Sequence, residues 1–114
     1  ASQLRQRIAV LGRELAALEQ KLLEPRRMIA ASLIQRHLGT TEHKRASPAF
    51  YLSCARQGRT HLVHVSKDRV AAVQCGVDAW RAYRAGLRRW REISSQMADL
   101  LRELGDVQAG HPGG

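Results

Sequence analysis

Apolar residues in the first quarter of the chain recur every three or four positions, which places them on one face of a helix. Spaced 4-3-4-3-4, they are Leu4, Ile8, Leu11, Leu15, Leu18 and Leu22. This spacing is typical of a coiled-coil seam. Ser2 can cap the helix, and Pro25 ends it, because a residue before proline is displaced from the helical conformation. The pattern predicts a helix over residues 2–24 that packs against another element.

A second helix is expected directly after the first, because Pro25 can occupy a first helical position. The apolar stripe of this expected helix consists of Ile29, Leu33, Ile34 and Leu38. Gly39 is a natural stop signal for it. Residues 39–48 are small, polar and basic and end at a proline, so they are expected to form a loop.

A short β-hairpin is predicted over residues 49–66, which read AFYLSCARQGRTHLVHVS. Residues 50–52 and 61–65 are rich in strand formers, and the segment Arg56–Arg59 supplies the turn. An isolated two-stranded hairpin is marginally stable. We therefore expect the hairpin's apolar side chains to pack on a helix; they are Phe50, Leu52, Val63 and Val65.

A long helix is predicted to follow Ser66, which can cap it, and to end at Gly105. Its apolar residues keep a three-four rhythm and are Val70, Val73, Val77, Trp80, Tyr83, Leu87, Trp90, Ile93, Met97, Leu100 and Leu104. At 1.5 Å per residue its length is roughly 57 Å, against roughly 35 Å for the first helix. The mismatch predicts a homodimer or a second protein. The expected oligomer interface comprises Leu11, Leu15, Leu18, Trp80, Leu87, Trp90 and Met97.

The predicted fold class is mainly α with one β-hairpin, in the order helix–helix–β-hairpin–long helix with coiled-coil-like packing. Residues 1–104 are expected to form a single domain and residues 105–114 a disordered tail. No run of about 18 apolar residues is present, so we expect no membrane span and a cytoplasmic protein.

Candidate metal and catalytic motifs are weak in this sequence. His61 and His64 are three apart in a predicted strand, so their side chains should lie on opposite faces. Cys54 and Cys75 form no CxxC pair and are expected to be reduced, buried thiols. There is no glycine-rich phosphate loop, nucleophile motif or cluster of acids near the basic centre. We therefore expect no metal, no cofactor and no enzymatic activity.

Positive charge is concentrated in the middle of the chain. The net charge is +9 with 19 basic residues, and residues 25–69 contribute nine basic and two acidic groups. A dense cationic region favours polyanionic partners through phosphate neutralisation. The candidate nucleic-acid-binding residues are Arg26, Arg27, Arg36, Lys44, Arg45, Arg56, Arg59, Lys67, Arg69, Arg81, Arg84 and Arg88.

Three interpretations of this charge remain open from the sequence. The arginines can bind a nucleic acid, dock an acidic protein, or form a solvated surface. In the first case Arg56 and Arg59 at the hairpin tip could enter a groove of DNA, while cations on the helix contact phosphates. In the second, the protein is a coiled-coil adaptor or scaffold. The sequence does not distinguish DNA from RNA.

The order of short motifs resembles a family of small bacterial proteins of unknown activity, often encoded beside transposase and other mobile-element genes. The resemblance spans roughly residues 26–104, and its motifs are Arg26-Arg27, Ser32-Leu33, Arg36, Gly39, Pro48–Ser53, Gly58-Arg59-Thr60, Val65-Ser66-Lys67, Tyr83 and Glu92-Ile93. Members commonly carry a cysteine cluster where this chain has residues 39–44, and here those cysteines are absent. The resemblance implies an accessory or regulatory protein of a mobile element that binds DNA, most simply duplex DNA, with a transposase as a candidate partner.

Overall fold

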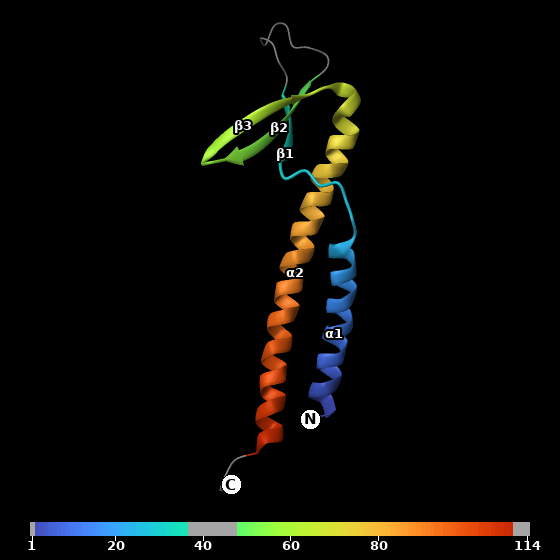
Figure 1. Cartoon of the computed structure of the whole chain (residues 1–114), viewed down its shortest axis with the longest axis vertical. Coiled ribbons are helices and arrows are strands. Elements are labelled where there is room, and N and C mark those ends of the chain that lie inside the picture. Colours follow the sequence, from blue (N-terminus) through green and yellow to red (C-terminus); the bar gives the residue numbers. More distant parts are fainter. Residues whose placement is uncertain (1, 37–47, 111–114) are drawn as a thin grey trace. The chain divides into compact units, whose positions relative to one another are not determined.

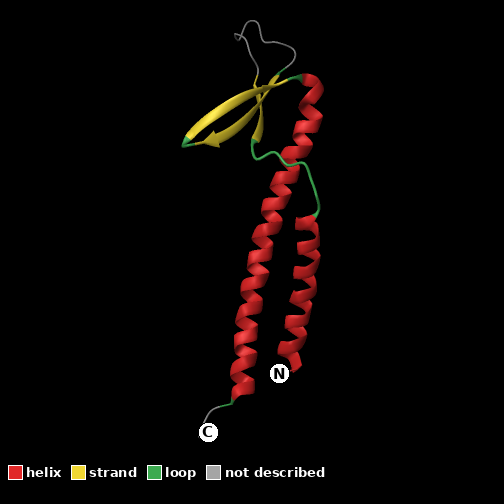
Figure 2. Ribbon diagram, viewed as in Figure 1, coloured by secondary structure: helices red, strands yellow, loops and turns green. Residues whose placement is uncertain are grey.

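The computed structural model of the chain describes residues 2–36 and 48–110. It contains helix α1 (Ser2–Leu23), strands β1 (Ser32–Arg36), β2 (Ala49–Arg56) and β3 (Arg59–Val65), a 3-10 turn (Lys67–Arg69) and helix α2 (Val70–Ala109), as Figures 1 and 2 show. Two compact units divide the chain. We call Ala1–Pro25 with Tyr83–Gly114 the helical unit, and Arg26–Ala82 the sheet unit.

The helical unit is an antiparallel pair formed by α1 and the C-terminal part of α2. All six predicted seam residues of α1 are half-buried, and α2 contributes Ile93 at 0 % exposure and Leu100 at 7 %. A Cβ placed on Gly86 would lie 3.3 Å from Leu22 Cδ2, and one placed on Gly12 would lie 3.9 Å from Met97 Cε. The reversed order of these contacts shows that the two helices run antiparallel, while coiled-coil-like packing stays a prediction.

Two polar contacts join the helices of the same unit. Arg89 Nη2 donates to Glu14 Oε1 at 2.9 Å, and Trp90 Nε1 donates to Glu19 Oε1 at 2.9 Å. The hydrogen bond to Glu14, followed by that to Glu92, raises the pKa of Arg89 above its ordinary value. These contacts specify which faces of the two helices meet.

The prediction of a second helix after Pro25 is wrong. Residues 25–30 form neither helix nor strand, and Ser32–Arg36 form strand β1, which pairs antiparallel with β2. The adjacent apolar residues Leu33 and Ile34 are compatible with a short strand as well as with a helix. A third strand also stabilises a hairpin that would be marginal alone. Tertiary pairing therefore overrides the helical spacing.

The sheet has the order β1-β2-β3, and the pairing register assigns each side chain to one of two faces. On the face toward α2, Leu33, Phe50, Leu52 and Val65 form the core with Ile29, Val70, Val73 and Val77. Val63 belongs to the same face but is 54 % exposed. The prediction that Val63 packs on a helix is wrong, because edge strand β3 meets the core only at its last residue.

Helix α2 extends beyond its predicted C-terminus. It continues past Gly105 to Ala109, so residues 105–109 are helical instead of forming the start of a tail. Ser66 has the extended conformation of an N-cap, and its carbonyl accepts from the Arg69 N–H at 3.0 Å. The hydroxyl of Ser66 forms no capping hydrogen bond, contrary to expectation.

Both parts of α2 pack against other elements of this chain. Residues Val70, Val73 and Val77 meet the sheet, and the part from Tyr83 onward meets α1. The length of α2 is therefore no reason to require a second copy. Homodimerisation stays a prediction without that support.

The segment between α1 and β1 is held against α2 at Gly76. The Ile29 N–H donates to the Gly76 carbonyl at 2.9 Å. A Cβ on Gly76 would lie 2.7 Å from Ile29 Cδ1, 2.8 Å from Cγ1 and 3.4 Å from Cβ. Because the hydrogen bond holds the Ile29 backbone, the side chain has little room to withdraw.

Gly76→Ala is expected to destabilise the sheet unit by about 1–3 kcal/mol, the usual cost of overpacking. The matched control is Gly105→Ala in the same helix, where a Cβ meets no atom within 4 Å. That control should stabilise the helix by about 0.5–1 kcal/mol, because alanine is the better helix former. Thermal denaturation followed by circular dichroism compares the two. A Gly76→Ala protein as stable as the control would show that the close approach to Ile29 is not required.

Candidate nucleic-acid interface

The tip of the β2–β3 hairpin is closed by a pair of arginines. Arg56 and Arg59 are the last residues in register, and the two residues between them have positive φ, 52° at Gln57 and 76° at Gly58. Positive φ at both central positions defines a type I′ turn, whose twist matches that of the flanking strands. The predicted turn at these residues is confirmed. Its geometry places both arginine side chains on the same face of the ribbon.

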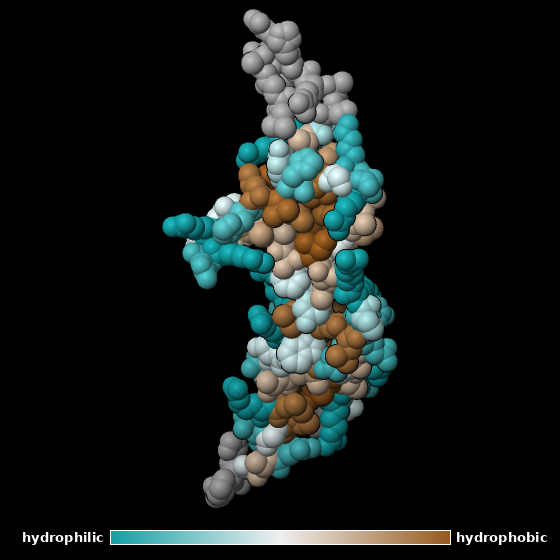
Figure 3. Space-filling view, turned by 45° about the horizontal axis from the view of Figure 1, so that its top comes forward, coloured by the Kyte–Doolittle hydropathy of each residue, from teal (hydrophilic) through white to brown (hydrophobic). Residues whose placement is uncertain are grey.

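The like charges of this pair oppose each other across the ladder. Cross-strand partners lie about 5.5 Å apart at Cα, and equal charges in such a pair are destabilising. In residues 2–36 and 48–110, neither Arg56 nor Arg59 has an ion-pair partner. Both are exposed, and Figure 3 colours the projecting end of the hairpin hydrophilic. An anion bound at the tip would relieve the repulsion.

The two units differ in their charge balance. The described part of the sheet unit contains eight basic residues and two acidic ones, Asp68 and Asp78, whereas the described part of the helical unit contains nine basic and seven acidic residues. The three strands contain no acidic residue at all. The charge excess of the chain therefore belongs to the sheet unit.

The predicted nucleic-acid-binding residues are distributed over both units. Those described in the sheet unit are all exposed; they are Arg26, Arg27, Arg36, Arg56, Arg59, Lys67, Arg69 and Arg81. Arg84 and Arg88 are exposed on the part of α2 in the helical unit. Arg26 and Arg84 already have interaction partners within the chain. Lys44 and Arg45 lie outside the described residues.

The predicted oligomer-interface residues are half-buried within the chain. In the helical unit these are Leu11, Leu15, Leu18, Leu87, Trp90 and Met97. Trp80 is half-buried in the sheet unit and also has an interaction partner in the chain. The indole N–H of Trp90 is engaged by Glu19. These side chains therefore already contribute to packing within one chain. In a dimer that also used them, the same side chains would have to contact both their own chain and the partner chain.

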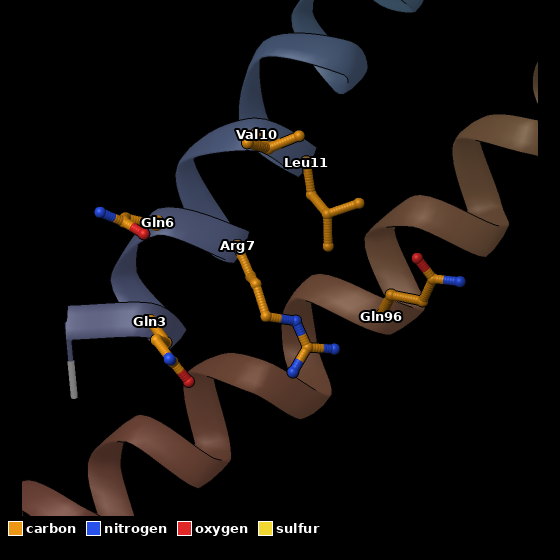
Figure 4. A pocket seen from close by; sticks show the side chains of 6 residues that line it. All are labelled: Gln3, Gln6, Arg7, Val10, Leu11 and Gln96. Atoms are coloured by element: carbon orange, nitrogen blue, oxygen red, sulfur yellow. The ribbon is translucent and has the colours of Figure 1, made fainter.

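A shallow groove of about 530 Å³ lies in the helical unit, lined by Gln3, Gln6, Arg7, Val10, Leu11 and Gln96. Figure 4 shows the Arg7 side chain extending from α1 toward α2, which contributes Gln96. The lining offers amides, one guanidinium and aliphatic carbons. It contains no nucleophile and no carboxylate, so it is no candidate for acid–base or covalent chemistry.

No group of three histidine, cysteine or acidic side chains is close enough to hold a metal ion in residues 2–36 and 48–110. His61 faces Cys54 and His64 faces Tyr51 across the hairpin, so the two histidines lie on opposite faces as predicted. Both cysteines are free thiols. Cys54 is half-buried and Cys75 is exposed, so the expectation of two buried thiols is wrong for both.

One group of neighbouring side chains was not predicted from the sequence: a row that crosses all three strands. Ile34, Tyr51 and His64 are in register, and the rings of Tyr51 and His64 meet edge to face at 5.4 Å and 76°. This row lies on the sheet face opposite the core. Recognising Ser32–Arg36 as a strand would have revealed it, because the register then aligns the three residues.

Comparisons with protein-family models, curated proteins and solved structures found no match. Of the helices among the described residues, neither α1 nor α2 has the length and apolar character needed to cross a membrane.

Proposed function

We propose that this protein binds nucleic acid through the sheet unit, chiefly by contacts of its arginines with phosphates. The observation that carries the proposal is the exposed pair Arg56–Arg59, two like charges held opposite each other without carboxylate partners in the described chain. Such a pair is unfavourable in isolation and favourable beside an anion. The phosphates that repeat along a nucleic acid are anions of this kind.

Duplex DNA is the proposed ligand of the hairpin. A two-stranded ribbon fits the major groove of B-DNA, and arginine can contact both phosphates and the edges of guanine. The remaining cations of the sheet unit would add backbone contacts, which set affinity but not sequence preference. Among the described residues of this unit, the two carboxylates, Asp68 and Asp78, lie outside the strands.

The resemblance to proteins encoded beside transposases supplies the proposed context, a DNA-binding accessory or regulator of a mobile element. A transposase would then be a candidate partner, and a homodimer would double the number of phosphate contacts. These proposals depend on the motifs of the sequence, since no relative was found that tests them.

Binding of wild-type protein to a labelled duplex of about 20 base pairs is the direct test. We expect binding that weakens steeply between about 50 and 200 mM salt, because counterions released from phosphates drive association. Purified protein should also retain nucleic acid, read from the ratio of absorbance at 260 and 280 nm. Absence of duplex binding even at the lower salt concentration would contradict the proposal.

The alternative is an adaptor that docks an acidic protein through the same arginines. Polyglutamate is a suitable probe, because it carries negative charge without phosphates or bases. The adaptor hypothesis predicts binding of polyglutamate with no binding of the duplex. The nucleic-acid hypothesis predicts that polyglutamate competes only weakly, because guanidinium groups match the geometry of phosphates closely and also contact base edges.

A further inference from the structure

The face of the sheet turned away from the core has a composition unlike that of a simple solvated surface. We call it the outer face; it consists of Ser32, Ile34 and Arg36 of β1, Ala49, Tyr51, Ser53 and Ala55 of β2, and Thr60, Leu62 and His64 of β3. It offers hydroxyl groups, one guanidinium and two rings. No carboxylate is present on any of the three strands.

Tyr51 occupies the middle of this face on the central strand. It is half-buried, with Ile34 beside it on β1 and His64, which is exposed, beside it on β3. The edge-to-face contact of the Tyr51 and His64 rings, at 5.4 Å between centroids, braces one side of the tyrosine. Ile34 is the register partner of Tyr51 on the other neighbouring strand.

The core does not account for this tyrosine. The apolar side chains that pack against α2 are on the other face, where Leu33, Phe50 and Leu52 meet Val73 and Val77. An aromatic ring braced by neighbours and lying on a sheet face without negative charge is the arrangement on which nucleic-acid bases stack.

We propose that the outer face binds an unpaired base of a nucleic acid, with the Tyr51 ring as the stacking surface and Arg36 as the phosphate contact. This inference rests on the proposed function and adds a substrate class: nucleic acid with a single-stranded segment. The hydroxyls of Ser53, two residues along the same strand, and of its cross-strand partner Ser32 lie next to Tyr51 in the register and can bond base edges. Arg56 and Arg59 at the hairpin tip are on the other face of the ribbon, so they are not part of this base-binding site.

The test compares three probes at one salt concentration: an oligothymidine of about 12 nucleotides, an abasic oligodeoxyribose phosphate of the same length, and a blunt duplex. The oligothymidine and the abasic strand carry equal phosphate charge, so only contacts to the bases separate them, and the Tyr51 variants then isolate stacking. We expect the wild-type protein to bind oligothymidine about 5- to 150-fold more tightly than the abasic strand, the range for stacking one base.

Two substitutions at one position isolate the ring. Tyr51→Leu should abolish the preference for oligothymidine and leave binding of the abasic strand unchanged. Tyr51→Phe keeps the ring and should preserve the preference. Circular dichroism and thermal denaturation of each variant establish that the sheet unit remains folded.

The outcomes separate this inference from the proposed function. Equal binding of oligothymidine and the abasic strand by wild-type protein, with the duplex also bound, would overturn the base-stacking inference alone. A Tyr51→Leu protein that loses affinity equally for all three probes would also overturn it, because the substitution would then act through the fold. Failure of wild-type protein to bind any of the three would refute the proposed function as well. A protein-docking face predicts no preference for bases and falls under the first outcome.

Discussion

Replacing Ile93 with alanine is expected to lower the free energy of unfolding by about 2–5 kcal/mol. Ile93 is 0 % exposed and lies on the part of α2 that packs against α1. The substitution removes three carbon atoms and leaves a cavity between two helices, which can collapse only in part. Urea denaturation followed by circular dichroism measures the loss. For a domain with a small core, it is a large fraction of the total stability.

The matched control is Leu101→Ala in the same helix. Leu101 is 51 % exposed, so its truncation should change the free energy of unfolding by no more than about 0.5 kcal/mol. Ile93→Val, which removes one methyl group, should fall between the two at about 0.5–1.5 kcal/mol. Equal effects of Ile93→Ala and Leu101→Ala would contradict the antiparallel packing of α1 on α2.

Removing both arginines of the hairpin tip is expected to weaken duplex binding by about 3 kcal/mol, more than a hundredfold. Each guanidinium donates a charge-assisted hydrogen bond worth at least about 1.5 kcal/mol. The variant is Arg56→Ala/Arg59→Ala, measured with a labelled duplex. Its fold should be intact, because both side chains are exposed and the change removes a like-charge pair. If either arginine contacts a base, its removal should reduce the binding free energy by about 1–3 kcal/mol on the preferred sequence and little on other sequences.

Two further variants control this result. Arg5→Ala/Arg102→Ala removes the same charge from exposed positions of the helical unit and should have a much smaller effect on affinity. Arg56→Lys/Arg59→Lys keeps the charge but not the planar donor fork, so it should recover phosphate binding better than contacts to base edges. Equal losses from the hairpin and helical-unit variants would show that total charge alone governs binding.

The helices were predictable from the sequence because their periodicity is strong. Every seam residue assigned to α1, from Leu4 to Leu22, is half-buried, and the residues assigned to α2 that are fully buried include Val77 and Ile93. Intrahelical spacing decides these positions. By contrast, the partner of α2 was not predictable, because periodicity identifies an apolar face but not what covers it.

The third strand could not be predicted from local pattern. In residues 26–36 the apolar positions fit a helix, and only pairing with β2 selects the strand; Leu33 opposite Leu52 is one such pair. The hydrogen bond and close approach of Ile29 to Gly76 further fix the segment that precedes β1. Interactions between residues far apart in the sequence therefore decide this part of the fold.

The same limit explains which part of the candidate site was predictable. A turn signal between two strand-like segments locates Arg56 and Arg59 at the hairpin tip, and the structure confirms that placement. The outer face around Tyr51 depends on the register of β1, which the sequence pattern concealed. Charge can be counted along a chain, but a surface built from three strands needs their pairing.

The salt dependence of duplex binding tests the proposed phosphate contacts of the hairpin most directly. Affinities of the wild-type protein and of Arg56→Ala/Arg59→Ala are measured over about 50–200 mM salt, and log K is plotted against log salt concentration. Each phosphate contact contributes about 0.9 to the steepness of this plot. We predict a slope for the double variant that is shallower by about two units. Parallel plots, with the same slope for both proteins, would contradict the claim that the hairpin tip binds phosphates.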